Sequence, residues 1–297
     1  MKTPIFFLIN MNSGRIKKEL PTIEKAILSE LDTNKYQSEI IKTHSLEEAY
    51  SALDNITSIP DSIVVAVGGD GTVNKTINRI VNKPVILGII PLGSGNALAR
   101  ELNISLNINK AITTLNKGKA RSIDLMLVNN KYYGACVGGI GFDALIARKF
   151  EKLETRGLKN YIRLAVREYF SYQNIEFILK INEKEFRRQA FLLSFANTRQ
   201  YGNNAFIAPK AVIDDGIIDV VILKKFHISD TPILATKLFT KSIDNSRYIE
   251  YFRAEEFEIK VEKSPIFIHL DGESIVEECK TIKVKNIHNH LKVIYES

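Results

Sequence analysis

The chain has 297 residues, of which 45% are hydrophobic and 25% are charged, so it is neither a disordered nor a fibrous protein. At roughly 100–200 residues per domain, this length predicts two domains, each with a core of its own. The formal net charge is +7, from 41 Lys and Arg against 34 Asp and Glu. Anionic membranes, nucleotides and nucleic acids therefore stay open as partners, beside a basic surface that is only solvated.

Neither the cysteines nor the N-terminal residues indicate a secreted or membrane-spanning chain. Cys136 and Cys279 stand in strand-like apolar contexts without a partner at metal-ligand spacing, which predicts ordinary reduced core residues. The apolar run 5–9 is far shorter than the ~18 residues of a membrane span, and no cleavage site follows it. We therefore expect a cytoplasmic protein.

The first 125 residues alternate short apolar runs with helical patterns, which is typical of an α/β fold with a parallel sheet. Ser45 and Glu48 have the spacing of a capping box, so a helix is expected to begin at Ser45. A strand followed by a glycine-rich loop and a helix occurs twice. The expected strands are 5–9, 36–42, 63–67 and 85–90, and the expected helices are 17–31, 45 onward, 73–81 and 97–102.

Beyond Asp124 the pattern changes to paired strands separated by turn residues, which predicts antiparallel pairing. We expect one domain over residues 1–125 and a second, mainly antiparallel β domain over 126–297. The final strand, 291–295, is left open to either domain. The other expected strands are 123–128, 132–137, 175–181, 186–196, 217–223, 256–261, 266–270 and 281–284, with helices near 157–169 and 229–242.

Polar and glycine-rich segments follow the strands of the first half. In an open parallel sheet, ligands bind at the carboxyl ends of the strands. The polar and glycine-rich segments at these ends are 10–15, Thr43, 68–74 and 93–96. Glycines let the backbone approach a phosphate closely, and helix N-termini present positive charge to it. The segments therefore predict an anion site, and the alternative is that the glycines only permit tight turns.

Asp70 makes the first glycine loop unusual. The loop matches neither the dinucleotide pattern G-x-G-x-x-G nor the pattern G-x-x-x-x-G-K-[ST]. A carboxylate among phosphate-binding amides repels phosphate, so it needs a bridging cation or a role in proton transfer. The alternative is a turn aspartate that bonds its own backbone.

Two strings carry a family resemblance: VGGDGTVN at 67–74 and PLGSGNALA at 91–99. Together they resemble the diacylglycerol kinase catalytic domain family, which also includes sphingosine kinases, ceramide kinases and bacterial lipid kinases. The segments DDGIID at 214–219 and DGE at 271–273 resemble further motifs of that family. The resemblance spans nearly the whole chain.

The resemblance implies a Rossmann-like nucleotide-binding domain followed by a β-sandwich-like domain, with the active site in the cleft between them. It implies transfer of the γ-phosphoryl group of Mg-ATP to the hydroxyl of a diacylglycerol-like or sphingoid lipid, in phospholipid biosynthesis. The cofactors would be ATP and Mg²⁺. One departure is Met11, where the family has proline, and we expect this to loosen the first loop.

The resemblance also implies which residues contact the nucleotide. Asp70 would organise the Mg-ATP complex, and Thr43 would line the nucleotide site. The full set of expected nucleotide-binding residues, from the loops and the resemblance together, is Asn10, Ser13, Gly14, Arg15, Thr43, Gly68, Gly69, Gly71, Thr72, Asn74, Ser94 and Asn96.

A lipid hydroxyl is a very weak acid, so a carboxylate must take its proton during transfer. Asp271 and Glu273 are the candidates; the resemblance favours Glu273 with Asp271 assisting, and the sequence does not separate them. The alternative for this triplet is an exposed hairpin tip.

A second cation site is implied in the segment 212–219. The resemblance places a structural Mg²⁺ on the Asp215 carboxylate and the carbonyls of Val212 and Ile217, an all-oxygen ligand set that suits this ion. The alternative is a turn in which Asp214 and Asp215 cap backbone amides.

The acceptor lipid is expected at 138–143 (GGIGFD), which resembles a family stretch that would line its pocket. We expect a lipid substrate at the membrane surface, transient peripheral membrane contact and no nucleic-acid partner; a homodimer is left open. Basic residues would meet anionic headgroups if they share a face. They are Arg163, Arg167, Arg187, Arg188, Lys224, Lys225 and Lys237.

Two other functions compete with a lipid kinase. An NAD kinase shares the GGDGT loop, although 91–99 matches lipid kinases. A non-catalytic lipid- or nucleotide-binding regulator would use the same fold, and the intact Asp70, Asp271 and Glu273 argue against it. The sequence does not choose among diacylglycerol, sphingoid bases and ceramide as acceptor.

Overall fold

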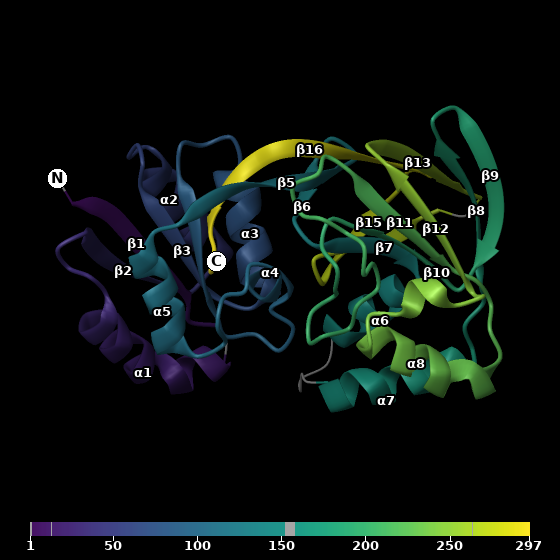
Figure 1. The fold of residues 1–297 in the computed structure, drawn as a ribbon, viewed down its shortest axis with the longest axis horizontal. Coiled ribbons are helices and arrows are strands. Elements are labelled where there is room, and N and C mark those ends of the chain that lie inside the picture. Colours follow the sequence, from purple (N-terminus) through teal and green to yellow (C-terminus); the bar gives the residue numbers. More distant parts are fainter. Residues whose placement is uncertain (1, 13, 152–157, 263) are drawn as a thin grey trace. The chain divides into compact units, whose positions relative to one another are not determined.

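The structure is a computed structural model that describes residues 2–12, 14–151, 158–262 and 264–297. The chain forms two compact units (Figure 1). Unit 1 consists of Met1–Ile123 together with Asn289–Ser297, and unit 2 consists of Asp124–His288.

Unit 1 is built on a parallel sheet whose strand order is β2–β1–β3–β4. The two central strands are buried apolar runs, as expected where helices cover both faces of a sheet. Each strand ends at a glycine or a polar or proline residue. The strands are β1 (Thr3–Asn10), β2 (Tyr36–Thr43), β3 (Ile63–Gly68) and β4 (Ile86–Pro91).

Five helices accompany this sheet: α1 (Gly14–Glu30), α2 (Leu46–Thr57), α3 (Asp70–Ile80), α4 (Ala97–Glu101) and α5 (Ile108–Lys117). Helix α1 packs against α5, and α2 packs against α3 (Figure 1). The Ser45 hydroxyl accepts a hydrogen bond from the Glu48 N–H at 3.0 Å, so Ser45 caps α2 at the expected place. The Glu48 carboxylate accepts from the His44 N–H at 2.6 Å.

The final residues of the chain also belong to unit 1. Strand β16 (Thr281–Ile294) pairs through Val293 with Leu87 of β4. Beyond it, the Glu296 carboxylate accepts a hydrogen bond from the Thr114 hydroxyl at 2.7 Å and forms an ion pair with Lys117. These contacts attach the last residues to α5.

Unit 2 contains a six-stranded antiparallel sheet in the order β12–β11–β10–β7–β14–β15. A second antiparallel layer has the order β16–β13–β8–β9, with β5 and β6 attached. The strands of the first sheet are β7 (Val137–Gly141), β10 (Leu192–Ala196), β11 (Ile218–Leu223), β12 (Ile249–Ala254), β14 (Ile266–Leu270) and β15 (Glu273–Glu277). Those of the second are β5 (Ala120–Val128), β6 (Tyr132–Gly134), β8 (Ile175–Ile181), β9 (Lys184–Ala190), β13 (Glu256–Val261) and β16.

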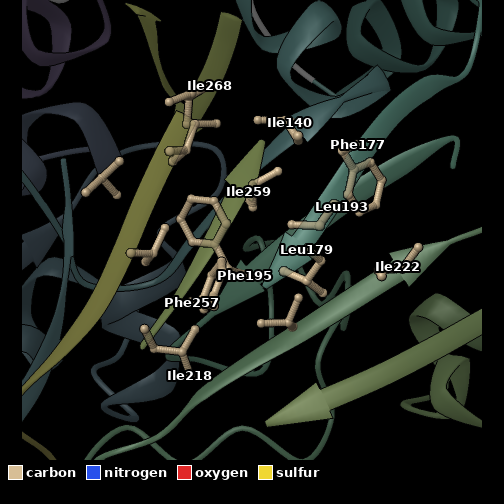
Figure 2. Packing of buried hydrophobic residues seen from close by; sticks show 14 of the residues in the cluster. Ile140, Phe177, Leu179, Leu193, Phe195, Ile218, Ile222, Phe257, Ile259 and Ile268 are labelled. Carbon is tan, nitrogen blue, oxygen red and sulfur yellow. The ribbon is translucent and has the colours of Figure 1, made fainter. Parts of the chain in front are cut away.

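The core of unit 2 is made by side chains from the strands of both layers (Figure 2). Phe195 of β10 and Phe257 of β13 lie with ring centroids 5.9 Å apart, and Ile259 and Ile268 are completely buried beside them. Two sheets that share one apolar core form a sandwich. Cys136 is buried as expected, whereas Cys279 is exposed, so the prediction of a core residue is wrong for Cys279.

Helices α6 (Phe142–Glu151), α7 (Leu158–Tyr169) and α8 (Thr231–Phe239) complete unit 2, with short 3₁₀ helices at Ile228–Asp230 and Ile243–Asn245. A separate apolar cluster seats α6 and α7. It contains Phe142, Ile146, Leu164, Phe191 and Leu192.

Candidate active site

The candidate nucleotide site lies at the carboxyl ends of the parallel strands in unit 1. In the strand register, Asn10 is paired with Thr43, and Gly68 is paired with Pro91. The four strands therefore end along one edge of the sheet, where a parallel sheet binds ligands.

The loop after β1 is attached to the end of β2. The Met11 N–H donates a hydrogen bond to the Thr43 carbonyl at 2.8 Å, and the Asn12 amide donates to the His44 carbonyl at 2.6 Å. Proline has no N–H and cannot make the first of these bonds. Met11 therefore adds a hydrogen bond that holds the loop, which opposes the loosening expected at this position. Ser13 and the side chain of Arg15 lie outside the described part of the chain, and Gly14 is the first residue of α1.

Asp70 joins the two glycine-rich loops. Its carboxylate accepts hydrogen bonds from the backbone N–H of Asn96 at 2.8 Å and of Ala97 at 2.6 Å, at the start of α4. A carboxylate on exposed helix N–H groups acts as a cap. These two bonds run to the second loop and not to the backbone of the turn that contains Asp70. They therefore differ from the alternative of an aspartate that bonds its own turn. An ionised carboxylate accepts at about four positions, so two amide bonds are compatible with a cation on the same group.

Gly69 and Gly93 let the two loops touch through their backbones. A Cβ atom on Gly93 would lie 2.5 Å from the Gly69 Cα and 2.8 Å from the Asn96 Oδ1. Asn96 has a left-handed backbone (φ 52°), and its side chain exchanges two hydrogen bonds of 2.8 Å with the backbone of Gly93. These glycines are therefore required by the contact between the loops and not by a turn alone.

A pocket of about 190 Å³ opens within unit 1, between the ends of β1 and β2 and the helices α2 and α3. From the two glycine loops, Thr72 lines it, whereas Asp70 and the second loop do not. The expected residues Asn10, Thr43 and Thr72 line it, together with Asn12, Ser45 and Lys75. Ser94 is exposed on the second loop and Asn74 bonds Asn78; neither lines this pocket. Lys75 was missed from the sequence, where its signal was a cation next to Asn74 in the second turn of a helix that begins at the glycine loop. Its charge suits a phosphate.

In unit 2, Asp271 is held rigidly by backbone amides. Its carboxylate accepts hydrogen bonds from the N–H groups of Ala135 at 2.7 Å, Cys136 at 2.8 Å and Val137 at 3.2 Å. These bonds explain why the expected strand 132–137 is divided into β6 and β7. A carboxylate occupied in this way fixes the turn from β14 to β15.

Glu273 is the first residue of β15 and pairs with Leu270 across the turn. The turn uses left-handed backbone at Asp271 (φ 51°) and Gly272 (φ 85°). Glu273 is partly exposed, whereas Asp271 is buried. The geometry therefore gives the two carboxylates different roles, with Asp271 holding the turn and Glu273 at the surface.

A buried polar cluster joins α6, β10 and β14. The Asp143 carboxylate accepts hydrogen bonds from Ser194 at 3.1 Å and Tyr201 at 3.1 Å, and it lies 2.9 Å from Nε2 of His269. The sequence did not reveal this cluster. A Cβ on Gly139 would lie 2.8 Å from the same carboxylate, so glycine is needed there for close packing. Whether 138–143 lines an acceptor pocket stays a prediction.

At the expected structural Mg²⁺ site, the carboxylate of Asp215 contacts an arginine. Asp215 forms an ion pair with Arg253 and accepts a hydrogen bond from the Ile217 N–H at 3.1 Å, while Val212 is exposed. Arg253 Nε also lies 3.4 Å from Asp219, whose pKa is raised by burial. Because the Arg253 guanidinium already neutralises Asp215, the residues as arranged do not fit Mg²⁺.

Comparisons with known proteins identify the family. Residues 4–128 match the family described as the diacylglycerol kinase catalytic domain, and residues 136–294 match the YegS C-terminal NAD kinase beta sandwich-like domain. The chain belongs to the diacylglycerol kinase catalytic domain family. It is a bacterial-type member, since it is similar to a diacylglycerol kinase of Bacillus subtilis and to a probable YegS-like lipid kinase of Shewanella frigidimarina.

Three similar proteins illustrate the match. A diacylglycerol kinase of Bacillus subtilis (strain 168) is 29% identical over 273 residues, covering 90% of this chain and 88% of that protein. A putative diacylglycerol kinase structure from Bacillus anthracis superposes with a TM-score of 0.80 at 19% identity, covering 99% and 95% of the two chains. An NAD kinase structure from Archaeoglobus fulgidus in complex with ATP gives a TM-score of 0.52 at 11% identity, covering 98% and 93%. These likenesses confirm the expected fold class of this lipid kinase family member.

Among the residues that the structure describes, no helix combines the length and the apolar character needed to cross a bilayer.

Proposed function

We propose that this family member transfers the γ-phosphoryl group of Mg-ATP to the hydroxyl of a diacylglycerol-like or sphingoid lipid. The observation that carries the proposal is the pair of glycine loops that Asp70 joins at the carboxyl ends of the parallel strands. A pocket lined by Asn10, Thr43 and Lys75 lies in the same unit. Backbone amides, hydroxyls and a cation at strand ends are suited to the phosphates of a nucleotide.

Phosphoryl transfer depends on alignment and on neutralised charge. Asp70 would hold Mg²⁺ with the phosphates, and that ion would neutralise the charge that develops on them. Lys75 would bind a phosphate oxygen. The lipid oxygen forms a bond to the γ-phosphorus while the bond to the oxygen that remains on ADP breaks.

Glu273 is the proposed acceptor of the hydroxyl proton, because it lies partly exposed at the start of β15. Asp271 would position it by fixing the turn through the amides of Ala135, Cys136 and Val137. The two carboxylates are thus given separate tasks.

The test incubates the purified protein with γ-labelled ATP and, in separate reactions, micelles of diacylglycerol, sphingosine or ceramide, or NAD. Label in one of the lipids, lost in Asp70→Ala and Glu273→Gln, is the expected result. Label in NAD alone would overturn the proposal in favour of an NAD kinase. Equal turnover of the wild type and both variants would remove the assigned roles, and binding without turnover would favour a regulator.

A further inference from the structure

One oxygen of the Asp143 carboxylate gathers three side chains of unit 2. Its Oδ2 lies 3.1 Å from the Ser194 hydroxyl, 3.1 Å from the Tyr201 hydroxyl and 2.9 Å from Nε2 of His269. Its Oδ1 accepts a hydrogen bond from the Ala144 N–H at 2.8 Å. An ionised carboxylate only accepts hydrogen bonds, at about four positions, so Nε2 carries a proton and the protein's own donors occupy the carboxylate. The cluster therefore acts through the elements that it holds.

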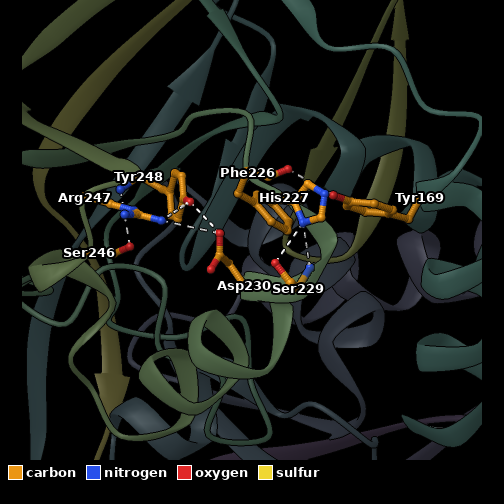
Figure 3. A network of polar contacts seen from close by, with 8 residues as sticks. All are labelled: Tyr169, Phe226, His227, Ser229, Asp230, Ser246, Arg247 and Tyr248. Carbon is orange, nitrogen blue, oxygen red and sulfur yellow. Dashed lines mark hydrogen bonds and ion pairs between the residues drawn. The ribbon is translucent and has the colours of Figure 1, made fainter.

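His269 makes a long-range contact from a buried position. The side chains of His269 and Asp143 are 5% and 9% exposed, and the two residues are 126 positions apart in the chain. By contrast, the exposed His227 contacts Ser229, two residues further along its own turn, at 2.8 Å (Figure 3). A contact within one turn orders only that turn, whereas the contact of His269 ties strand β14 to the start of α6.

The glycine at position 139 makes room for this contact. In the sheet, His269 pairs with Gly139 of β7. A Cβ atom on Gly139 would lie 2.8 Å from Oδ2 of Asp143 and 3.0 Å from Nε2 of His269, close to both atoms of the pair. A larger residue would push the imidazole and the carboxylate apart. Strand β7 therefore carries no side chain at the place where His269 and Asp143 meet.

Strand β14 is anchored on both sides of Leu270. His269, the residue before it, is held by Asp143. Asp271, the residue after it, is held by three backbone N–H groups. Glu273 follows across the turn and pairs with Leu270. The direction in which Glu273 leaves the sheet therefore depends on two anchors, one on a side chain of α6 and one on backbone amides.

Packing alone does not explain a buried polar cluster at this place. Burying a carboxylate and an imidazole costs free energy that their mutual contact only partly offsets, and apolar side chains of similar size often stabilise a core equally well or better. Ionisable groups that stay buried despite this cost are common at functional sites, where orientation matters. His269 stands two residues before Asp271 and four before Glu273, so the orientation that it controls is that of the turn carrying these carboxylates.

We propose that His269, held by Asp143, is a positioning residue for phosphoryl transfer: it fixes the end of β14 so that the Glu273 carboxylate is presented to the acceptor hydroxyl in one orientation. The proposal rests on the proposed function, since Glu273 is the proton acceptor there. Proton transfer requires hydrogen-bond geometry, and a displacement of about 1 Å can lower a rate by roughly 10²-fold. Loss of the His269 contact should therefore act on kcat and leave substrate binding unchanged.

Steady-state kinetics with γ-labelled ATP and the lipid that the wild type phosphorylates test the proposal. His269→Leu keeps a similar side-chain size but cannot bond Asp143, and we expect kcat to fall roughly 10- to 100-fold while KM for ATP and for lipid stays within about twofold. His269→Gln places an amide N–H near the position of Nε2, so it should restore most of kcat. Asp143→Ala should lower kcat at least as much as His269→Leu does. Adding His269→Leu to it should cause no further loss, because both substitutions remove one contact.

Val220→Ala is the matched control. Val220 is completely buried in β11 of the same sheet and belongs to the sandwich core, so this variant loses stability while the Asp143 cluster stays intact. It should lower Tm and leave kcat unchanged. Equal kcat values for the wild type and His269→Leu, with Glu273→Gln inactive, would overturn the proposal and leave the proposed function standing. An equal loss of kcat in Val220→Ala would also overturn it, because lost stability would then account for the effect.

Backbone hydrogen exchange of residues 270–274 gives a readout that does not depend on turnover. We expect exchange to be about tenfold faster in His269→Leu and in Asp143→Ala, and unchanged in His269→Gln and Val220→Ala. Asp143→Ala gives the same test if His269→Leu does not fold. If the wild type labels no lipid but exchange rises as expected, the proposed function fails and the anchoring of β14 by His269 stands. Unchanged exchange in both His269→Leu and Asp143→Ala would overturn the anchoring.

Discussion

The carboxylate of Asp70 and the backbone N–H of Asn96 lie 2.8 Å apart, so the first glycine loop caps the helix that follows the second. Asp70→Asn should therefore affect both stability and catalysis. We expect a loss of about 1–2 kcal/mol in the free energy of unfolding. The asparagine side chain has one oxygen acceptor, so its NH₂ group would face the second backbone N–H. We expect kcat to fall about a hundredfold or more, because the phosphate charge is no longer neutralised.

Denaturant unfolding and steady-state kinetics measure the two effects. Asp54→Asn is the control, since Asp54 forms a surface ion pair with Arg79 and is remote from the loops in sequence. It should leave kcat unchanged. Full activity of Asp70→Asn would contradict the role given to this carboxylate.

Replacing Asp271 and Glu273 by their amides should affect different properties, stability for Asp271→Asn and turnover for Glu273→Gln. Asp271→Asn faces backbone N–H groups with an NH₂ group, so we expect a loss of roughly 2–3 kcal/mol in unfolding free energy. Glu273→Gln should leave Tm within about 2 °C while kcat falls roughly 10²- to 10⁴-fold. Thermal unfolding and single-turnover phosphorylation distinguish them. The opposite pattern, with Asp271→Asn stable but inactive and Glu273→Gln active, would assign the base to Asp271.

Lys75 should contribute to nucleotide affinity. Lys75→Ala removes a cation from the pocket that Asn10 and Thr43 line, so we expect KM for ATP to rise about tenfold with a smaller change in kcat. Lys83→Ala provides the control, because Lys83 is exposed and does not line the pocket. Equal KM values for the two variants would show that Lys75 does not bind the nucleotide.

Gly93→Ala should strain the contact between the loops. The added methyl group would meet the Gly69 backbone, and we expect a destabilisation of about 1–3 kcal/mol. Ser94→Ala, at the exposed neighbouring position, should not change the unfolding midpoint. A Gly93→Ala protein as stable as the wild type would mean that the loops can separate at no cost.

The buried Glu168 should make part of the stability depend on pH. Hydrogen bonds from Lys149 and Arg167 lower the pKa of this carboxyl against the opposing effect of burial. A carboxyl whose pKa is lower in the folded state stabilises the fold above its unfolded pKa, about 4.5, and loses that contribution as pH falls through the folded value. Glu168→Gln should therefore have a lower Tm at pH 7, and the difference should shrink below about pH 4.

Glu262→Gln is the matched control for this pH series, since Glu262 and Arg187 form an ion pair in which both side chains are 71% exposed. Its Tm should follow the wild type at every pH, because exposed pairs are strongly screened. A pH-independent difference for Glu168→Gln would show that packing and not charge accounts for its effect.

The parallel half could be predicted from the sequence because local signals agreed with the fold. Buried apolar runs such as 63–67 end at glycines, and Ser45 with Glu48 marks a helix start that the hydrogen bonds confirm. Helix α5 was not predicted, although Asn107 caps it and Gly118 ends it in a left-handed conformation. The cap and the terminal glycine are visible in the sequence. The segment lies between a glycine-rich and a β-rich stretch, and only those two stretches were interpreted.

Contacts between distant residues could not be predicted in this way. The sequence predicts one continuous strand at 132–137. The structure divides it into β6 and β7, because the N–H groups of Ala135 and Cys136 donate to Asp271, which lies far along the chain. Strand β16 was expected in two pieces because its centre is polar, yet it is one strand. The Asp143 cluster likewise depends on α6, β10 and β14 lying together, which no local pattern encodes.

The return of residues 289–297 to unit 1 has a consequence for biosynthesis. The Leu87 contact of Val293 and the Thr114 bond of Glu296 form only after all of unit 2 has been translated. About 165 residues of intervening chain correspond to roughly 10–30 s of elongation at about 5–20 residues per second. During this interval the edge of β4 in the nascent unit 1 is unpaired, and an unpaired edge can pair with another chain. The time at which residues 289–297 are translated therefore decides when the first-made part of the protein is protected from aggregation.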